Sequence, residues 1–166
     1  MTLRAAIFDA AGTLMELRET VGETYSRFAA LEGVEISPAR LQDAFERYVP
    51  TAGVPPQLGD TPEEVSAGER SWWRTVVRGT FRSADGSATF GDFESFFSDL
   101  YEFYGSATAW RLRPGVAKGL ARLRQSGVHV AVLSNFDHRL PAILDALGIL
   151  ELLETVALPS NTGPAI

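Results

Sequence analysis

Two short apolar runs, separated by a long stretch of helical pattern, constrain this chain most. Residues 5–8 and 128–133 have the length and composition of buried strands, and the first run is apolar at every position. Such a run is typical of a strand in the middle of a parallel sheet, covered on both faces. Residues 155–158 form a third, shorter candidate strand. Because helical patterns separate the three runs, we predict a parallel sheet built from βαβ-type units.

The stretch from residue 17 to residue 108 shows helix signals and no strand alternation. Ser37 followed by Pro38 is a typical helix start, and Thr61 with Glu64 three residues later forms a capping box. Aromatic residues recur at helical spacing over residues 90–104. This stripe is typical of the core of a helix bundle rather than of a cofactor site.

These patterns predict an α/β fold with an inserted helical region. We expect a Rossmann-like parallel sheet of about three strands, formed by residues 1–16 and 109–166. Residues 17–108 are expected to form an all-α cap inserted after the first strand. In parallel sheets of this kind, ligands bind beyond the carboxyl ends of the strands.

Asp9 directly follows the first apolar run and is the strongest candidate for a catalytic group. A carboxylate nucleophile divides a difficult displacement into two easier ones through a covalent intermediate. The turn that follows, from Ala10 to Thr13, offers backbone N–H groups to an anion, and Gly12 allows a close approach.

Ser134 and Asn135 directly follow the second apolar run, at the start of the next expected helix. The hydroxyl, the amide and the helix N-terminus would together favour a phosphate or carboxylate group. Ordinary helix capping also explains this pair, but Asp9 at the end of another strand favours the anion site. We expect Asp9 and Ser134 to meet if their strands are neighbours.

The motifs Asp9-Ala10-Ala11-Gly12-Thr13-Leu14 and Leu133-Ser134-Asn135 resemble the first two motifs of the haloacid dehalogenase-like (HAD) hydrolase superfamily. The helical insertion resembles a C1-type cap. Further segments around Val21–Tyr25, Ser71–Trp73 and Ser134–Asp137 are similar to the HAD domain-containing protein 3 (REG-2-like) subgroup.

This resemblance implies phosphatase-type phosphoryl transfer through an aspartyl-phosphate at Asp9. It also implies Mg²⁺ held by the Asp9 carboxylate and the backbone carbonyl of Ala11. Ser134 would bind the transferred group with support from Asn135, and Gly12 and Thr13 would contribute to the phosphate site. The partner would be a small phosphorylated or other anionic substrate.

Ala11 departs from the phosphatase pattern, which has a second Asp two residues after the nucleophile. Members with a non-acidic residue there include 2-haloacid dehalogenases and phosphonatase-type hydrolases, which are one alternative. A non-catalytic anion-binding or interaction fragment is a second alternative to the phosphatase.

The resemblance also leads us to expect that the chain is truncated before the third motif, a lysine expected near Ile166, and before the fourth motif, which is acidic. Lys118, the one lysine, lies elsewhere, on the expected helix before the second strand.

The composition narrows the classes of partner. The net charge is −6, so there is no basic footprint for nucleic acid. The chain has no cysteine, which excludes thiolate chemistry and disulfides within it. No apolar run is long enough to be a signal peptide core or a membrane span. We therefore expect a cytoplasmic protein without a membrane partner, and the oligomeric state stays open.

Overall fold

The computed structural model of the chain describes residues 3–55 and 61–162. It divides into two compact units. The first, here called the α/β unit, comprises Met1–Arg18 and Tyr104–Ile166, and the second, the helical unit, comprises Glu19–Phe103.

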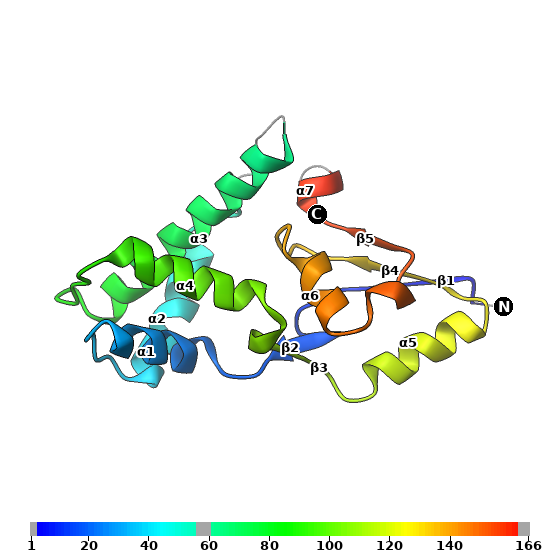
Figure 1. The fold of residues 1–166 in the computed structure, drawn as a ribbon, viewed down its shortest axis with the longest axis horizontal. Coiled ribbons are helices and arrows are strands. Elements are labelled where there is room, and N and C mark those ends of the chain that lie inside the picture. Colours follow the sequence, from blue (N-terminus) through cyan, green and yellow to red (C-terminus); the bar gives the residue numbers. More distant parts are fainter. Residues whose placement is uncertain (1–2, 56–60, 163–166) are drawn as a thin grey trace. The chain divides into compact units, whose positions relative to one another are not determined.

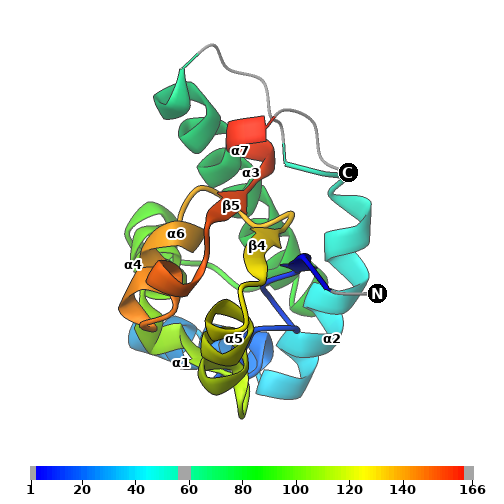
Figure 2. The same cartoon turned by 90° about the vertical axis from the view of Figure 1, so that its right-hand side faces the viewer.

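A three-stranded parallel sheet is the centre of the α/β unit (Figure 1). Its strands are β1 (Ala5–Phe8), β4 (His129–Leu133) and β5 (Thr155–Ala157), in the spatial order β1-β4-β5, which the end-on view also shows (Figure 2). β1 and β4 are aligned so that Phe8 lies beside Val132. The predicted α/β class and parallel sheet are confirmed.

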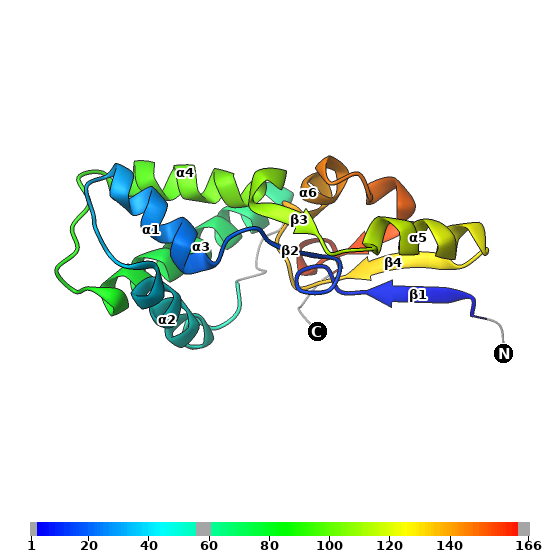
Figure 3. The same ribbon diagram turned by 90° about the horizontal axis from the view of Figure 1, so that it is seen from below.

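Helices α5 (Val116–Gln125) and α6 (Leu140–Ala146) lie on the same side of this sheet (Figure 3). The β4 residues that face them, Val130 and Val132, are completely buried. The unit also contains the 3₁₀ helices η2 (Ala107–Ala109) and η3 (Leu150–Leu152) and the short helix α7 (Pro159–Thr162).

No helix of the described residues covers the opposite face of the sheet, which corrects one expectation from the sequence. We expected the first strand in the middle of the sheet, buried on both sides. Within the described residues β1 is instead an edge strand, and Ile7 is 67% exposed. Leu133 of β4, on the same face, is 37% exposed. An apolar strand needs a covering layer on each face to be fully buried, and here the helices supply only one.

A small antiparallel ribbon was not anticipated from the sequence. It pairs β2 (Met15–Leu17) with β3 (Trp110–Leu112), so that Leu17 lies opposite Trp110. Strands of three residues are too short to show an alternating pattern, and their pairing partner lies far away in the sequence.

The helical unit contains the predicted helices (Figure 1). They are α1 (Val21–Leu31), α2 (Pro38–Tyr48), α3 (Pro62–Ala84) and α4 (Phe93–Gly105), with the 3₁₀ helix η1 (Val49–Thr51) after α2. The last two residues of α4 belong to the α/β unit. Ser37 caps α2, and Thr61 forms the predicted capping box with Glu64 at the start of α3. Within the described residues, none of the helices combines the length and the apolar character needed to cross a membrane.

Aromatic side chains form much of the core of this unit, as predicted from the stripe on α4. Phe96 and Phe97 are both about 1% exposed. Phe81 of α3 meets Phe96 edge to face, with 5.3 Å between ring centroids, and stacks on Tyr25 of α1 at 5.7 Å. Such ring pairs add to the apolar burial that holds α1, α3 and α4 together.

Candidate active site

Asp9 and Ser134 meet at the carboxyl end of the sheet. Each follows its strand directly, and the parallel register of β1 and β4 brings the two strand ends side by side. The Ser134 hydroxyl donates a hydrogen bond of 2.9 Å to Oδ1 of Asp9. Ser134 is only 6% exposed, whereas Asp9 is open to solvent. A carboxylate that is both held in place and accessible is the arrangement that the predicted nucleophile requires.

Backbone hydrogen bonds fix the position of Ser134. The backbone N–H of Ser134 donates to the Ala157 carbonyl at 3.1 Å, which extends the pairing of β4 with β5. Its Oγ also accepts a longer bond of 3.4 Å from the Phe136 N–H. Because the hydroxyl accepts from one side, its proton is free to point towards Asp9.

The turn after Asp9 is closed by bonds within itself. The Ala10 carbonyl accepts from the N–H groups of Thr13, Leu14 and Met15, and Gly12 donates to the Met15 carbonyl at 2.7 Å. Gly12 has φ of +83°, a left-handed conformation that favours glycine. The N–H groups of Gly12 and Thr13, which the sequence suggested for anion binding, are thus used inside the turn. The exposed Thr13 hydroxyl stays available to a ligand.

Two oxygen atoms of this segment suit a hard cation. The Asp9 carboxylate is exposed, and the carbonyl of the exposed Ala11 accepts no hydrogen bond from the part of the chain that the structure describes. Mg²⁺ binds one or two protein oxygens and completes its coordination with water and substrate phosphate. The Asp9 carboxylate and the Ala11 carbonyl therefore supply two oxygen ligands of the kind that Mg²⁺ prefers.

Arg113 is a residue of this site that the sequence reasoning missed. Its guanidinium donates to the Gly12 carbonyl at 2.5 Å, and its backbone N–H donates to the Leu14 carbonyl at 3.0 Å. It also lies 3.6 Å from a carboxylate oxygen of Glu16. Arg113 thus holds the Asp9 turn from a position 101 residues after Gly12. No local sequence pattern could have identified Arg113, because its partners in the turn lie about one hundred positions away.

Asn135 and the following helix differ from expectation. We expected Ser134 and Asn135 to begin a helix whose N-terminus would favour an anion, but α6 starts only at Leu140. The intervening Asp137 carboxylate accepts from the backbone N–H and the guanidinium of Arg139, which forms a turn instead of a helix. The helix N-terminus therefore does not contribute at Ser134, and Asn135 is exposed.

The expected position of the third-motif lysine, near Ile166, lies outside the described residues. Lys118, the only lysine in the sequence, is exposed on α5.

Residues 3–165 match the family described as haloacid dehalogenase-like hydrolase. Among curated proteins, the chain is 32% identical over 164 residues to the haloacid dehalogenase-like hydrolase domain-containing protein 3 of Mus musculus. The match covers 98% of this chain and 64% of the mouse protein, so the chain spans a little under two thirds of this relative's length.

Solved structures show the same fold. An L-2-haloacid dehalogenase matches with a TM-score of 0.66 and 18% identity, over 99% of this chain and 67% of that one. A predicted phosphoglycolate phosphatase from Haemophilus somnus matches with a TM-score of 0.59 and 20% identity, over 99% and 65%. Together with the match to the family, these similarities confirm the predicted resemblance: the chain belongs to the haloacid dehalogenase-like hydrolases.

Proposed function

We propose that this chain carries the nucleophile of a phosphatase-like hydrolase that acts on a small phosphate ester. The observation that carries the proposal is the solvent-open Asp9 carboxylate, held by the Ser134 hydroxyl at 2.9 Å where two neighbouring parallel strands end. Membership of the hydrolase family adds to it.

In the first step, an Asp9 oxygen forms a bond to phosphorus while the bond from phosphorus to the ester oxygen breaks. In the second step, water attacks the phosphorus while the bond between phosphorus and the Asp9 oxygen breaks. The attacking water gives one proton to the solvent, inorganic phosphate is released, and the Asp9 carboxylate is restored. The Thr13 hydroxyl donates to a phosphoryl oxygen, and the Ser134 hydroxyl turns its one proton from Asp9 to the bound phosphoryl group. Asn135 supports Ser134 from the same loop. Mg²⁺ held by Asp9 and the Ala11 carbonyl would offset the repulsion between carboxylate and phosphate when bound.

Ala11 limits the substrates that suit this mechanism. It stands where an acid would protonate the leaving oxygen, and its methyl group carries no proton to give. General acid catalysis is worth about 10²–10⁴-fold in rate, so esters of poor leaving groups should react slowly. We propose aryl phosphates as the better substrates, with the predicted cap, residues 17–108, deciding among them.

A second candidate is a 2-haloacid dehalogenase or phosphonatase-type hydrolase, and Ala11 is the observation that favours it. A dehalogenase needs no acid at this position, because a halide leaves without a proton. Asp9 would then attack the carbon atom that carries the halogen, and no metal would be required.

The experiment compares p-nitrophenyl phosphate with 2-chloropropionate, each with and without Mg²⁺. Release of p-nitrophenol that needs Mg²⁺ and is abolished by Asp9→Asn supports the phosphatase. Metal-independent chloride release that Asp9→Asn abolishes supports the dehalogenase instead. If neither product forms while the protein melts cooperatively, a non-catalytic anion-binding role replaces both.

A further inference from the structure

Four arginines recur at every fourth position along α3: Arg70, Arg74, Arg78 and Arg82. This spacing places them on one face of the helix, where like charges repel by a few tenths of a kcal/mol per pair, roughly. The chain as a whole is acidic, with a net charge of −6. A row of positive charge on one helix of such a chain therefore needs a reason.

The last three of these arginines line a pocket of about 410 Å³ in the helical unit. Thr75 and Ser83 of α3 also line it, and Tyr48 of α2 forms part of its wall. Small-molecule sites begin at roughly 300 Å³, so the pocket has room for more than a simple inorganic ion.

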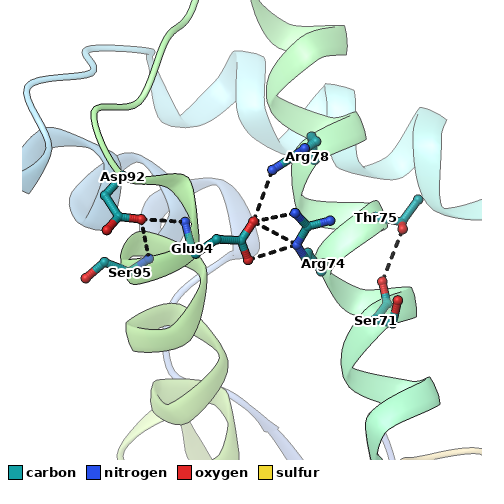
Figure 4. A network of polar contacts seen from close by, with 7 residues as sticks. All are labelled: Ser71, Arg74, Thr75, Arg78, Asp92, Glu94 and Ser95. Carbon is teal, nitrogen blue, oxygen red and sulfur yellow. Dashed lines mark hydrogen bonds and ion pairs between the residues drawn. The ribbon is translucent and has the colours of Figure 1, made fainter.

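Glu94 of α4 holds two of the guanidinium groups in place (Figure 4). The Nε of Arg74 lies 2.9 Å from each oxygen of the Glu94 carboxylate, and Arg78 reaches the same carboxylate at 3.3 Å. The guanidinium of Arg78 also lies over the ring of Phe93, 4.3 Å from its centroid. Both cations are thus oriented before any ligand binds, which lowers the entropy that binding would cost.

The positive charge of the pocket is only partly balanced. One carboxylate, Glu94, serves two arginines, and Arg82 is exposed with no ion pair to another described residue. Asp85, at the end of α3, accepts from the N–H and hydroxyl of Ser87. Counting Glu94 against Arg74, Arg78 and Arg82 leaves about two positive charges, which suits a dianion.

Tyr48 gives the pocket an aromatic wall beside these charges. A Cβ added to Gly79 of α3 would lie 2.0 Å from Cζ of Tyr48, so the ring rests directly on the backbone of α3. The ring is half-buried and lines the pocket. A flat apolar wall next to guanidinium groups suits a ligand with one organic and one anionic part.

We propose that this pocket binds a small organic phosphate, with the dianionic group on Arg78 and Arg82 and the organic part against Tyr48. Phosphate is favoured over a single carboxylate because the arginine pair matches both its charge and its several acceptor oxygens. The Ser83 hydroxyl adds a donor, whereas the Thr75 hydroxyl already donates to the Ser71 carbonyl. The site involves neither Asp9 nor Ser134 and does not depend on their activity.

The test uses phenylphosphonate, whose carbon–phosphorus bond resists a phosphatase, as probe for the whole chain in two-dimensional NMR. Inorganic phosphate and benzoate are the comparison ligands. Arg82→Gln and Arg82→Lys are the variants, and Arg47→Gln, an exposed residue of α2 outside the pocket lining, is the charge-matched control. The titrations with all three ligands are repeated on the Asp9→Asn variant, and melting curves verify that each variant folds.

We expect phenylphosphonate to shift the amides of residues 75–83 and to bind more tightly than inorganic phosphate or benzoate. Arg82→Gln should weaken binding roughly five- to tenfold, Arg82→Lys should weaken it less, and Arg47→Gln should change it less than about twofold. Asp9→Asn should leave the shifts at residues 75–83 unchanged. The proposal is overturned if only residues near Asp9 and Ser134 shift, if Arg47→Gln weakens binding as much as Arg82→Gln, or if nothing binds.

Discussion

The contact between Ser134 and Asp9 makes a measurable prediction about stability. Both residues belong to the α/β unit, and their bond is 2.9 Å long with Ser134 buried. A hydrogen bond to a charged group contributes about 1.5–3 kcal/mol when it is shielded. Because Asp9 is open to water, which competes for the carboxylate, we expect a coupling of about 1 kcal/mol, or roughly fivefold in the unfolding equilibrium.

The assay is a double-mutant cycle in urea at neutral pH. Ser134→Ala, Asp9→Ala and the double variant are compared with the unchanged chain, and the coupling is the difference between the double variant and the sum of the single ones. A matched cycle of Asn135→Ala with Asp9→Ala should be additive, because the exposed Asn135 has no hydrogen bond with Asp9 among the described residues. A coupling below about 0.3 kcal/mol for Ser134 and Asp9 would refute the contact as a stabilising one.

The remaining predictions concern four single positions. Gly79→Ala should destabilise the chain by about 1–3 kcal/mol in urea, since its Cβ would meet a tyrosine ring at 2.0 Å. Gly119→Ala, in α5 with nothing within 4 Å, should instead stabilise it by about 0.5–1 kcal/mol, and the same sign for both would contradict this. The hydrogen bonds from Arg74 lower the pKa of Glu94, so a ¹³C titration should find this pKa below that of an ordinary glutamate carboxyl group. A carboxyl group whose pKa is lowered by folding stabilises the folded state at pH values above its unfolded pKa. This contribution is lost as the pH falls through the pKa of folded Glu94. Ile7→Thr should cost less than about 1 kcal/mol, because Ile7 is 67% exposed, and a loss above about 2 kcal/mol would mean that the face is covered in solution.

Features set by neighbouring residues were predictable from the sequence. The capping box at Thr61 and the cap at Ser37 depend on side chains within three positions, and both occur as expected. The meeting of Asp9 with Ser134 followed from topology, because parallel strands in one sheet end at the same edge. The structure brings the two side chains together, and their roles in catalysis stay a proposal.

Features set by distant partners were not predictable in the same way. The exposure of Ile7 depends on which elements cover the sheet, and an apolar run does not reveal this. The late start of α6 depends on the carboxylate of Asp137 bonding Arg139 in place of a helical turn. The contact of Arg113 with the Asp9 turn joins residues about a hundred positions apart, and no local pattern marks it.

The β2–β3 ribbon has a consequence for how this gene product can be divided. Leu17 lies opposite Trp110, and the Arg18 N–H donates to the Ala109 carbonyl at 2.9 Å. The segments that lead into and out of residues 19–108 are therefore paired like the two strands of a hairpin. Paired residues of such a stem are close enough for a tight turn of about two to five residues to join them. The intervening segment could therefore be excised and the stem reconnected by a short loop, which would give a minimal α/β protein that still holds Asp9 and Ser134.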